Sequence, residues 1–412
     1  MSASPQTAPA PPVNQRPATF APEAELLIHC ARVELDQHRA GMIRAIVAGE
    51  PHWELLLSLA VRHGMIPLVH FHLNALRTGP REAAAAARLR EYALRISAMN
   101  AYLTGELRHL LAAFEARGVG AIPYKGPALA MEAYGSVSLR YFCDLDILVR
   151  KRDYAAARDI LGERGFRPYQ GLGLAQQSVM LRTQCNVPFT RDDDRSIVEI
   201  HWEVAARNYS RALDERGLWS RSREASFAGA RVRLLAPEDL LHALCVHGSK
   251  HLWERLSWIC DVAQLVGRGP QLDWDSLLDR ARATGSTRLL LLGLNLADEL
   301  LGATLPPNVR IEIDADARVA RLTRRVLATL FAEAGPAEGM SGYFGFQLGA
   351  RERLRDKLRY FGYTLGPTDE DVAQLSLPRP LSFIYYLLRP LRLLRTGGPA
   401  HLQGRGKKEL PR

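Results

Sequence analysis

Hydrophobic positions recur with helical spacing over most of the chain. In the region 21–117, Leu56 and Leu59 share one helical face, and an alanine-rich run at 83–87 opens a long helical stretch. Helical spacing returns after Pro237, where proline and acidic residues mark a helix start. Further helices are predicted over 274–283, 287–301, 318–334 and 351–360.

The middle of the chain, 118–235, has a different pattern. Short apolar runs, some of them rich in β-branched residues, are separated by polar turns and by stretches of helical periodicity. This pattern indicates an α+β unit inside a mostly helical protein. Strands are predicted over 119–124, 144–149, 186–190 and 196–204, and helices over 128–134 and 154–164.

These changes of pattern divide the chain into six regions. The first twenty residues are rich in proline and alanine, so they cannot bury a core and are expected to be disordered. The predicted regions are a tail at 1–20, an N-terminal helical region at 21–117, the α+β unit at 118–235, a helical domain at 236–332, a C-terminal helical region at 333–396 and a basic tail at 397–412.

The net charge of +10 lies mostly at the C-terminal end. From Arg351 onward there are 13 Lys and Arg against 6 Asp and Glu, so this end carries +7 and the rest of the chain +3. A nearly balanced body needs no polyanionic partner, and a nucleic-acid partner is not expected. The segment 381–395 is apolar with spaced arginines, so it suits either an anionic membrane surface or, as we favour, docking on the protein.

The sequence indicates a cytoplasmic protein. Its N-terminus lacks the basic and then apolar pattern of a signal peptide, and no run reaches the roughly 18 apolar residues of a membrane span. The five cysteines include no Cys-x-x-Cys pair, so neither a zinc ribbon nor a redox motif is supported. Reduced thiols are therefore expected.

Two carboxylates lie side by side on one predicted strand. Asp144 and Asp146 are two residues apart, so on a strand their side chains point to the same face. Glu199, followed by His201, adds a third carboxylate from a second apolar strand. Hard oxygen ligands of this kind suit Mg²⁺ or Mn²⁺ and can form a two-metal site. The alternative is that Glu199 pairs with an arginine and the aspartates mark a strand edge.

A phosphate-binding element is expected just before this strand. Lys125 and Gly126 stand where a strand turns into a helix, so a lysine and a positive helix end are presented together. Arg140, four residues before Asp144, adds a cation for a leaving pyrophosphate or for the carboxylates.

Histidines gather in the helical stretch after Pro237. His247 and His251 are four residues apart and share a helical face, with Lys250 between them. One interpretation is a metal site, although the glutamate that a metalloprotease motif places after the first histidine is absent. The other is packing of the helix against the core.

Several motifs together resemble a bacterial family of uncharacterised nucleotidyltransferases. The stretches 123–134 and 139–149 are similar to its Lys-Gly and Arg-x-x-x-Asp-x-Asp signature, and 198–202 (Val-Glu-Ile-His-Trp) is similar to its Glu-Leu-His-Trp strand. The resemblance extends over about 55–306. It implies a polymerase-beta-like nucleotidyltransferase palm, a mixed sheet with flanking helices, at 118–235.

The resemblance also implies roles for particular residues. The metal-binding carboxylates are matched by Asp144, Asp146 and Glu199, and the phosphate-side signature is matched by Lys125, Gly126 and Arg140. The chain has Lys-Gly-Pro where the wider superfamily has Gly-Ser. The resemblance adds a third interpretation of the histidines, in which the cleft contacts are His201, His247, Lys250 and His251.

The expected activity is transfer of a nucleoside monophosphate from an NTP, with Mg²⁺ or Mn²⁺, to a hydroxyl or phosphate of an acceptor. The acceptor is a small molecule, peptide, protein or sugar. The alternative is a catalytically silent scaffold protein in a biosynthetic gene cluster. Retention of all three carboxylates argues against a silent site, because such a site does not need clustered acids. An RNA nucleotidyltransferase ranks lowest.

Overall fold

The structure is a computed structural model of the 412-residue chain. It describes residues 20–169, 174–191, 196–206, 209, 213, 215–268, 271–332, 339–365, 381 and 384. The predictions for the N-terminal tail up to residue 19, for the basic tail and for nearly all of 381–395 lie outside the described residues.

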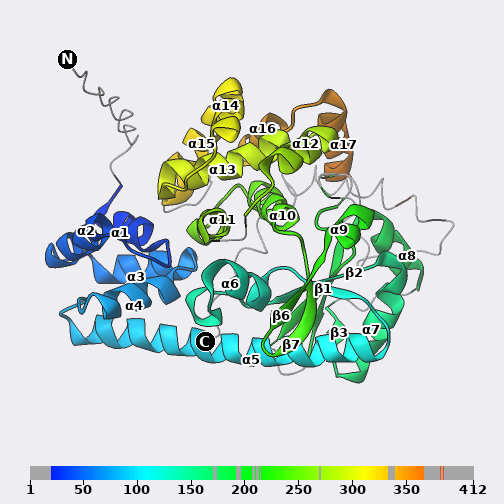
Figure 1. Cartoon of the computed structure of the whole chain (residues 1–412), viewed down its shortest axis with the longest axis horizontal. Coiled ribbons are helices and arrows are strands. Elements are labelled where there is room, and N and C mark those ends of the chain that lie inside the picture. The colour runs from blue at the N-terminus through cyan, green and yellow to red at the C-terminus, as the bar shows by residue number, and fades with distance from the viewer. Residues whose placement is uncertain are drawn as a thin grey trace, which may run out of the picture.

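Five helices build the N-terminal part of the molecule (Figure 1). They are α1 (Pro22–Cys30), α2 (Gln37–Ala48), α3 (Trp53–Arg62), α4 (Ile66–Ala75) and α5 (Ala83–Ala116). The Asp36 carboxylate accepts the Arg39 backbone N–H at 2.7 Å and so caps α2. On the 34-residue α5, buried Leu103, Leu107 and Leu110 recur at helical spacing. This apolar face packs the C-terminal half of α5 against the sheet, while its N-terminal half lies against α4 (Figure 1).

A five-stranded mixed sheet lies at the centre of the α+β unit, in the spatial order β1-β2-β5-β4-β3. Its strands are β1 (Ala121–Pro123), β2 (Leu145–Val149), β3 (Arg167–Pro168), β4 (Asn186–Thr190) and β5 (Ile197–His201). β2 and β5 pair in parallel, whereas the other neighbours pair antiparallel. The parallel pairing places Asp146 opposite Glu199. The predicted α+β architecture with a mixed sheet is confirmed.

Shorter elements surround the sheet. They are α6 (Gly126–Tyr134), η1 (Val137–Leu139), η2 (Lys151–Asp153), α7 (Tyr154–Glu163), α8 (Leu174–Thr183), α9 (Glu215–Arg221) and a hairpin of β6 (Arg223–Phe227) and β7 (Ala230–Leu234). The pattern of the sequence did not predict β3, α8 or this hairpin. In β7 only Val232 and Leu234 are buried, so its hydrophobic signal is short and easily missed.

Helices form the remainder of the described chain. They are α10 (Pro237–Lys250), α11 (Leu256–Arg268), α12 (Trp274–Thr284), α13 (Thr287–Leu301), α14 (Pro307–Ala315), α15 (Ala317–Leu330), α16 (Gly339–Gly349) and α17 (Leu354–Leu365). Two glycines bring α10 close to α13 and to the loop after α10. A Cβ on Gly248 would lie 2.5 Å from the Trp253 ring, and one on Gly293 would lie 2.5 Å from Cys245 Sγ. This close packing fixes the C-terminal end of α10.

The N-terminal helices and the helices after the sheet share one hydrophobic core. Leu26 and Leu57 belong to the same buried cluster as Leu265 and Leu296. A second cluster lies between α5 and the sheet. The N-terminal helices therefore pack on the later helices rather than forming a core of their own.

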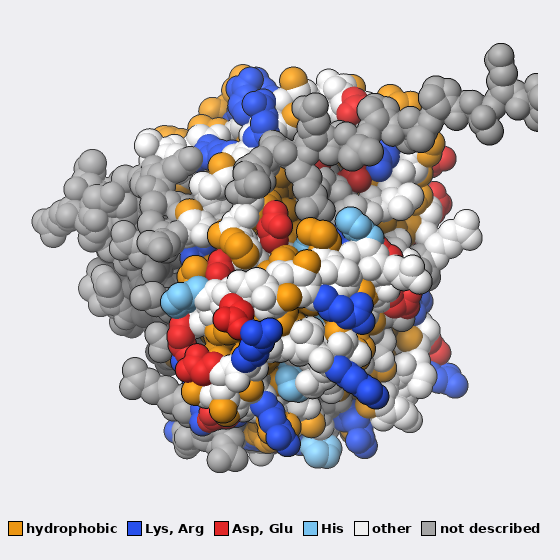
Figure 2. Space-filling model, turned by 90° about the vertical axis from the view of Figure 1, so that its left-hand side faces the viewer, with side chains coloured by type: hydrophobic (Ala, Val, Ile, Leu, Met, Phe, Trp, Pro, Cys, Tyr) orange, Lys and Arg blue, Asp and Glu red, His pale blue; other side chains and the backbone are white. Residues whose placement is uncertain are grey.

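The described surface mixes charges of both signs. Figure 2 shows the side of the molecule formed by the N-terminal helices, where basic and acidic side chains both occur across the face. Ion pairs occur in the N-terminal region: Arg81 Nη1 lies 2.6 Å from Glu50 Oε1, and Arg95 Nη2 lies 2.7 Å from Glu91 Oε1. Within the described ranges, no helix combines the length and the apolar character that crossing a membrane requires.

Candidate functional site

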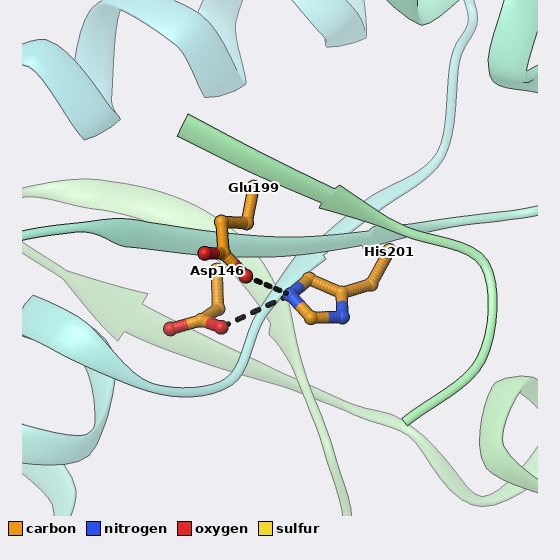
Figure 3. Close-up of side chains that lie close together, drawn as sticks. All are labelled: Asp146, Glu199 and His201. Carbon is orange, nitrogen blue, oxygen red and sulfur yellow. Dashed lines mark hydrogen bonds and ion pairs between the residues drawn. The ribbon is translucent and has the colours of Figure 1, made fainter. Parts of the chain in front are cut away.

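Three potential metal ligands converge on one face of the central strands. Asp146 on β2 is opposite Glu199 on β5, and His201 lies two residues beyond Glu199 on the same face. One ligand atom from each of these residues lies within 4.8 Å of the others. Figure 3 shows the imidazole of His201 pointing at both carboxylates. The strand register therefore brings Asp146, Glu199 and His201 together, whereas the group predicted from the sequence joined Asp144 and Asp146 with Glu199.

His201 holds this group together. Its Nε2 lies 3.0 Å from Asp146 Oδ1 and 3.4 Å from Glu199 Oε2, and its Nδ1 lies 3.2 Å from the hydroxyl of Tyr124. Burial on its own would lower the pKa of His201. The hydrogen bonds to Asp146, Cys185 and Glu199 outweigh burial and raise this pKa well above its ordinary value. The imidazole is therefore protonated between two carboxylates.

Lys125 brings a second cation to the same carboxylate. Its Nζ lies 3.0 Å from Asp146 Oδ1, and its side chain is only 15% exposed. Burial would raise the pKa of Asp146, but Lys125 and His201 outweigh it and hold this pKa well below its usual range. Asn186 Nδ2 donates a hydrogen bond of 2.7 Å to Glu199 Oε2. Both carboxylates are therefore oriented by neighbours.

Glycine at position 126 allows this arrangement. Gly126 has φ +53° and begins α6, and a Cβ there would lie 3.0 Å from the carbonyl oxygen of Asp144. The backbone before α6 can thus pass close to the start of β2, which places Lys125 beside Asp146. Asp144 is half-buried, directly before β2, and lies outside the three-residue group. Its charge contributes to raising the pKa of Tyr141, after burial and Cys143.

Arg140 is placed differently from the other predicted site residues. Its Nε lies 2.7 Å from Asp261 Oδ1, and its Nη2 lies 2.9 Å from Asp261 Oδ2. The Tyr134 hydroxyl donates to the same Oδ1 at 2.7 Å, and Asn100 Nδ2 donates to the Arg140 carbonyl at 2.8 Å. The pair joins the loop before β2 to α11. The phosphate contact of Arg140 stays a prediction, because Asp261 occupies two of its nitrogens.

The C-terminal end of α10 brings its histidines toward the same group. The rings of His247 and His251 lie 4.8 Å apart, and Trp258 of α11 lies 5.1 Å from the first and 5.5 Å from the second, between ring centres. Burial, with Lys125 among the neighbouring charges, lowers the pKa of both histidines well below the ordinary value. Both imidazoles are uncharged, in contrast to His201.

The α10 histidines have open ring nitrogens. No hydrogen bond joins the His247 or His251 ring to another side chain in the described part of the molecule. Between them, the Lys250 carbonyl accepts hydrogen bonds from Tyr343 at 3.3 Å and from Gln347 at 3.2 Å. We call His247, Lys250, His251 and Trp258 the α10–α11 wall. Of these, Trp258 was not predicted, because an aromatic residue in an apolar helix reads as core.

The carboxylates of Asp146 and Glu199 are ligands of the kind that a hard divalent cation prefers. Asp146 and Glu199 supply oxygen ligands from adjacent strands, and Asp144 stands two residues before Asp146. Both cationic contacts of Asp146 converge on Oδ1, and no described side chain donates to its Oδ2. This oxygen is therefore available to a ligand.

Sequence reasoning missed three residues that organise the site. Tyr124 and Asn186 contact His201 and Glu199, and Asp261 holds Arg140. Tyr124 had a usable signal, since it lies at the end of a predicted strand next to Lys125, whereas Asn186 begins a predicted strand with no predicted site residue beside it in the sequence. The pairing of Asp261 with Arg140 had no signal, because the two residues are 121 positions apart.

Comparison with known proteins gives one match. A family model described as an uncharacterised nucleotidyltransferase matches residues 49–302, more than half of the chain and close to the range over which the motifs resemble such a family. No curated protein and no solved structure matches the chain. The matched range includes every residue of the group on the strands and of the α10–α11 wall. The chain therefore belongs to an uncharacterised nucleotidyltransferase family.

Proposed function

We propose that this protein is a metal-dependent nucleotidyltransferase that moves a nucleoside monophosphate from an NTP to a hydroxyl or phosphate of its acceptor. The acceptor is a small molecule, peptide, protein or sugar. The acceptor oxygen attacks the α-phosphorus, the bond from that phosphorus to the β-phosphate oxygen breaks, and pyrophosphate leaves. The observation that carries the proposal is the pairing of Asp146 and Glu199 across parallel strands beside Lys125.

The carboxylates would hold the metal ion. Asp144, Asp146 and Glu199 would bind Mg²⁺ or Mn²⁺ through oxygen ligands, and Asp146 Oδ2 is the atom best placed to accept it. When bound, the ion supplies Lewis-acid stabilisation of charge on the phosphates. His201 orients both carboxylates, and Asn186 fixes the Glu199 oxygen that it contacts.

Lys125 and the start of α6 would bind the triphosphate. The helix begins at Gly126, directly after Lys125, so the positive end of α6 adjoins this lysine in the chain. A triphosphate bound there would draw Lys125 away from Asp146 and thereby free the carboxylate. The α10–α11 wall would contact the nucleotide or the acceptor through His247, His251 and Lys250.

Arg140 would act as a positioning residue. Its paired contact with Asp261 holds α11, and with it Trp258, against the loop that leads to Asp144. This keeps the α10–α11 wall at a set distance from the carboxylates.

The test uses the purified full-length chain and each α-labelled NTP with Mg²⁺ or Mn²⁺. We expect self-labelling or pyrophosphate release with at least one NTP, and its loss in Asp146→Asn and Glu199→Gln. Exposed Asp159→Asn, which removes a carboxylate remote from the site, should behave as the unchanged protein. Equal turnover in all variants would exclude the carboxylate role.

One observation favours the silent scaffold as a second candidate. Lys125 and His201 already balance the charge of Asp146 within the protein, so the buried carboxylate is stable without a bound cation. A scaffold would show neither metal-dependent NTP binding in calorimetry nor pyrophosphate release with any NTP. Metal-dependent NTP binding without transfer would instead point to a missing acceptor.

A further inference from the structure

A small basic hollow lies beside the C-terminal end of β2 and the N-terminal end of β1. Its volume is about 260 Å³, and it is lined by Arg150, Arg216, Trp219 and Ser220. Arg150 follows β2 directly, and the other three residues lie on α9. The hollow therefore stands between the end of a central strand and a short helix.

The floor of the hollow is an arginine stacked on an indole. The guanidinium carbon of Arg150 lies 4.1 Å from the centre of the Trp219 ring. Gly120, just before β1, makes room for the pair. A Cβ at this position would lie 3.1 Å from the Trp219 ring and 3.3 Å from Arg150 Nη1. The stacking holds the planar guanidinium in one orientation, with its edge free to bind.

No acid of the described residues pairs with the arginines of the hollow. In the described residues, neither Arg150 nor Arg216 forms an ion pair or a side-chain hydrogen bond. Other arginines of this region do find partners: Arg221 Nε lies 2.8 Å from Asp239 Oδ2. The indole Nε1 of Trp219 is buried and lacks a hydrogen-bond partner in the same residues. Two guanidinium groups without an ion pair in the described residues thus line the hollow, and the buried indole N–H of Trp219 belongs to a residue of its lining.

We infer that this hollow is a binding site for a small phosphate-type anion, separate from the carboxylate site. Guanidinium groups match the tetrahedral oxygens of phosphate with paired N–H donors, and the hydroxyl of Ser220 lines the same space. Inorganic phosphate and pyrophosphate both fit this chemistry.

The position of the hollow sets it apart from the carboxylates. Arg150 follows Asp146 by four residues of extended chain, about 13 Å along β2. Gly120 precedes Lys125 by five residues along β1. An anion in the hollow would therefore contact the far ends of the strands that place Lys125 and Asp146, without touching either side chain.

The test follows the indole N–H of Trp219 by NMR in the full-length, ¹⁵N-labelled chain, which has six tryptophans. The variant Trp219→Phe identifies the resonance. We titrate inorganic phosphate and, separately, pyrophosphate at constant ionic strength with no metal or NTP present. A saturable shift of the Trp219 signal is expected, weakened at least tenfold in both Arg150→Gln and Arg216→Gln.

Controls separate this site from general charge effects and from the proposed activity. Arg231→Gln removes a largely exposed arginine of β7 and should bind as the unchanged chain does. The double variant Asp146→Asn, Glu199→Gln should also retain the shift, so the outcome does not depend on nucleotidyl transfer. A shift that is absent, that does not saturate, or that persists in Arg216→Gln overturns the proposal. Because Arg216 is exposed, that variant is expected to fold.

Discussion

Two buried aspartates in this protein each hold a cation, but their contacts differ. Asp261 uses both carboxylate oxygens: Oδ1 accepts from Arg140 and Tyr134, and Oδ2 accepts from Arg140. Asp146 receives Lys125 and His201 on the same Oδ1, at 3.0 Å each. No described side chain donates to its Oδ2.

The difference separates a carboxylate whose oxygens are both occupied from one with an open oxygen. A carboxylate whose oxygens are both occupied has nothing to gain from a ligand, and removing it leaves a buried arginine without a partner. A carboxylate with one open oxygen and two cations on the other can exchange a contact for a metal ion. We therefore expect Asp261 to act on stability and Asp146 to act on activity.

The largest expected effect is on transfer by Asp146→Asn. The substitution removes the charge that would bind the metal ion, so turnover should fall by about 10³-fold or more. Folding should change little, because His201 can lose its proton and the Lys125 ammonium can reach solvent. Thermal unfolding and NTP-dependent pyrophosphate release measure the two effects, and Asp144→Asn should behave in the same way. Full activity in both variants would contradict the metal role.

Asp261→Asn should instead act mainly on stability rather than on transfer. It leaves Arg140 buried beside a neutral amide, so the free energy of unfolding should fall by about 3–5 kcal/mol. The exposed pair of Arg231 and Glu224 gives a matched control, since Glu224→Gln should change stability by about 1 kcal/mol or less. Denaturant titration measures the free energy of unfolding of each variant. A change in Asp261→Asn no larger than in the control would show that the contact between Arg140 and Asp261 does not stabilise the fold.

Sequence distance decides how much of this difference could be predicted. Local signals placed β4 at Asn186–Thr190 and α13 at Thr287–Leu301, and the spacing of Asp144, Asp146 and Glu199 indicated strands that bring carboxylates together. Alternation along a strand needs only neighbouring residues. The parallel register of β2 with β5 then follows from packing of two apolar strands.

The partner of Arg140 could not be predicted in this way. Asp261 lies on α11, and its approach to Arg140 depends on how the helices after the sheet pack on the loop before β2. From the sequence, a lone arginine before two aspartates looks like a phosphate ligand. The same reasoning missed the hairpin β6–β7, whose strands are polar at half of their positions and are paired by backbone contacts.

The variant Lys125→Gln tests the role of the lysine that contacts Asp146, the carboxylate with the open oxygen. If Lys125 binds the triphosphate, kcat/KM for the NTP should fall by about 10²-fold, or about 2.7 kcal/mol, mainly through KM. If it serves only to balance Asp146, the stability should fall instead and KM should be unchanged. Lys357→Gln on α17 is the control for loss of one lysine, and initial rates over a range of NTP concentrations separate the outcomes.

The smallest expected effect concerns a buried imidazole that, unlike His201, stays uncharged. His242 is fully buried, its Nε2 lies 2.9 Å from Ser286 Oγ, and burial together with Arg280 and Arg221 lowers its pKa to about 3. The folded pKa lies below the unfolded value near 6.5, so the unfolded chain binds the proton first. Stability should therefore fall as the pH drops from about 6.5 toward 3. Between pH 7 and 5 this histidine should contribute about 2 kcal/mol of that loss.

His242→Gln tests this contribution. The variant is less stable at pH 7 because the contact with Ser286 changes, but it should lose about 2 kcal/mol less than the unchanged chain between pH 7 and 5. Denaturant titrations at both pH values measure the difference. An identical loss in the two proteins would mean that His242 does not titrate on unfolding. The acid sensitivity would then have to come from another buried imidazole such as His63, whose pKa burial also lowers to about 3.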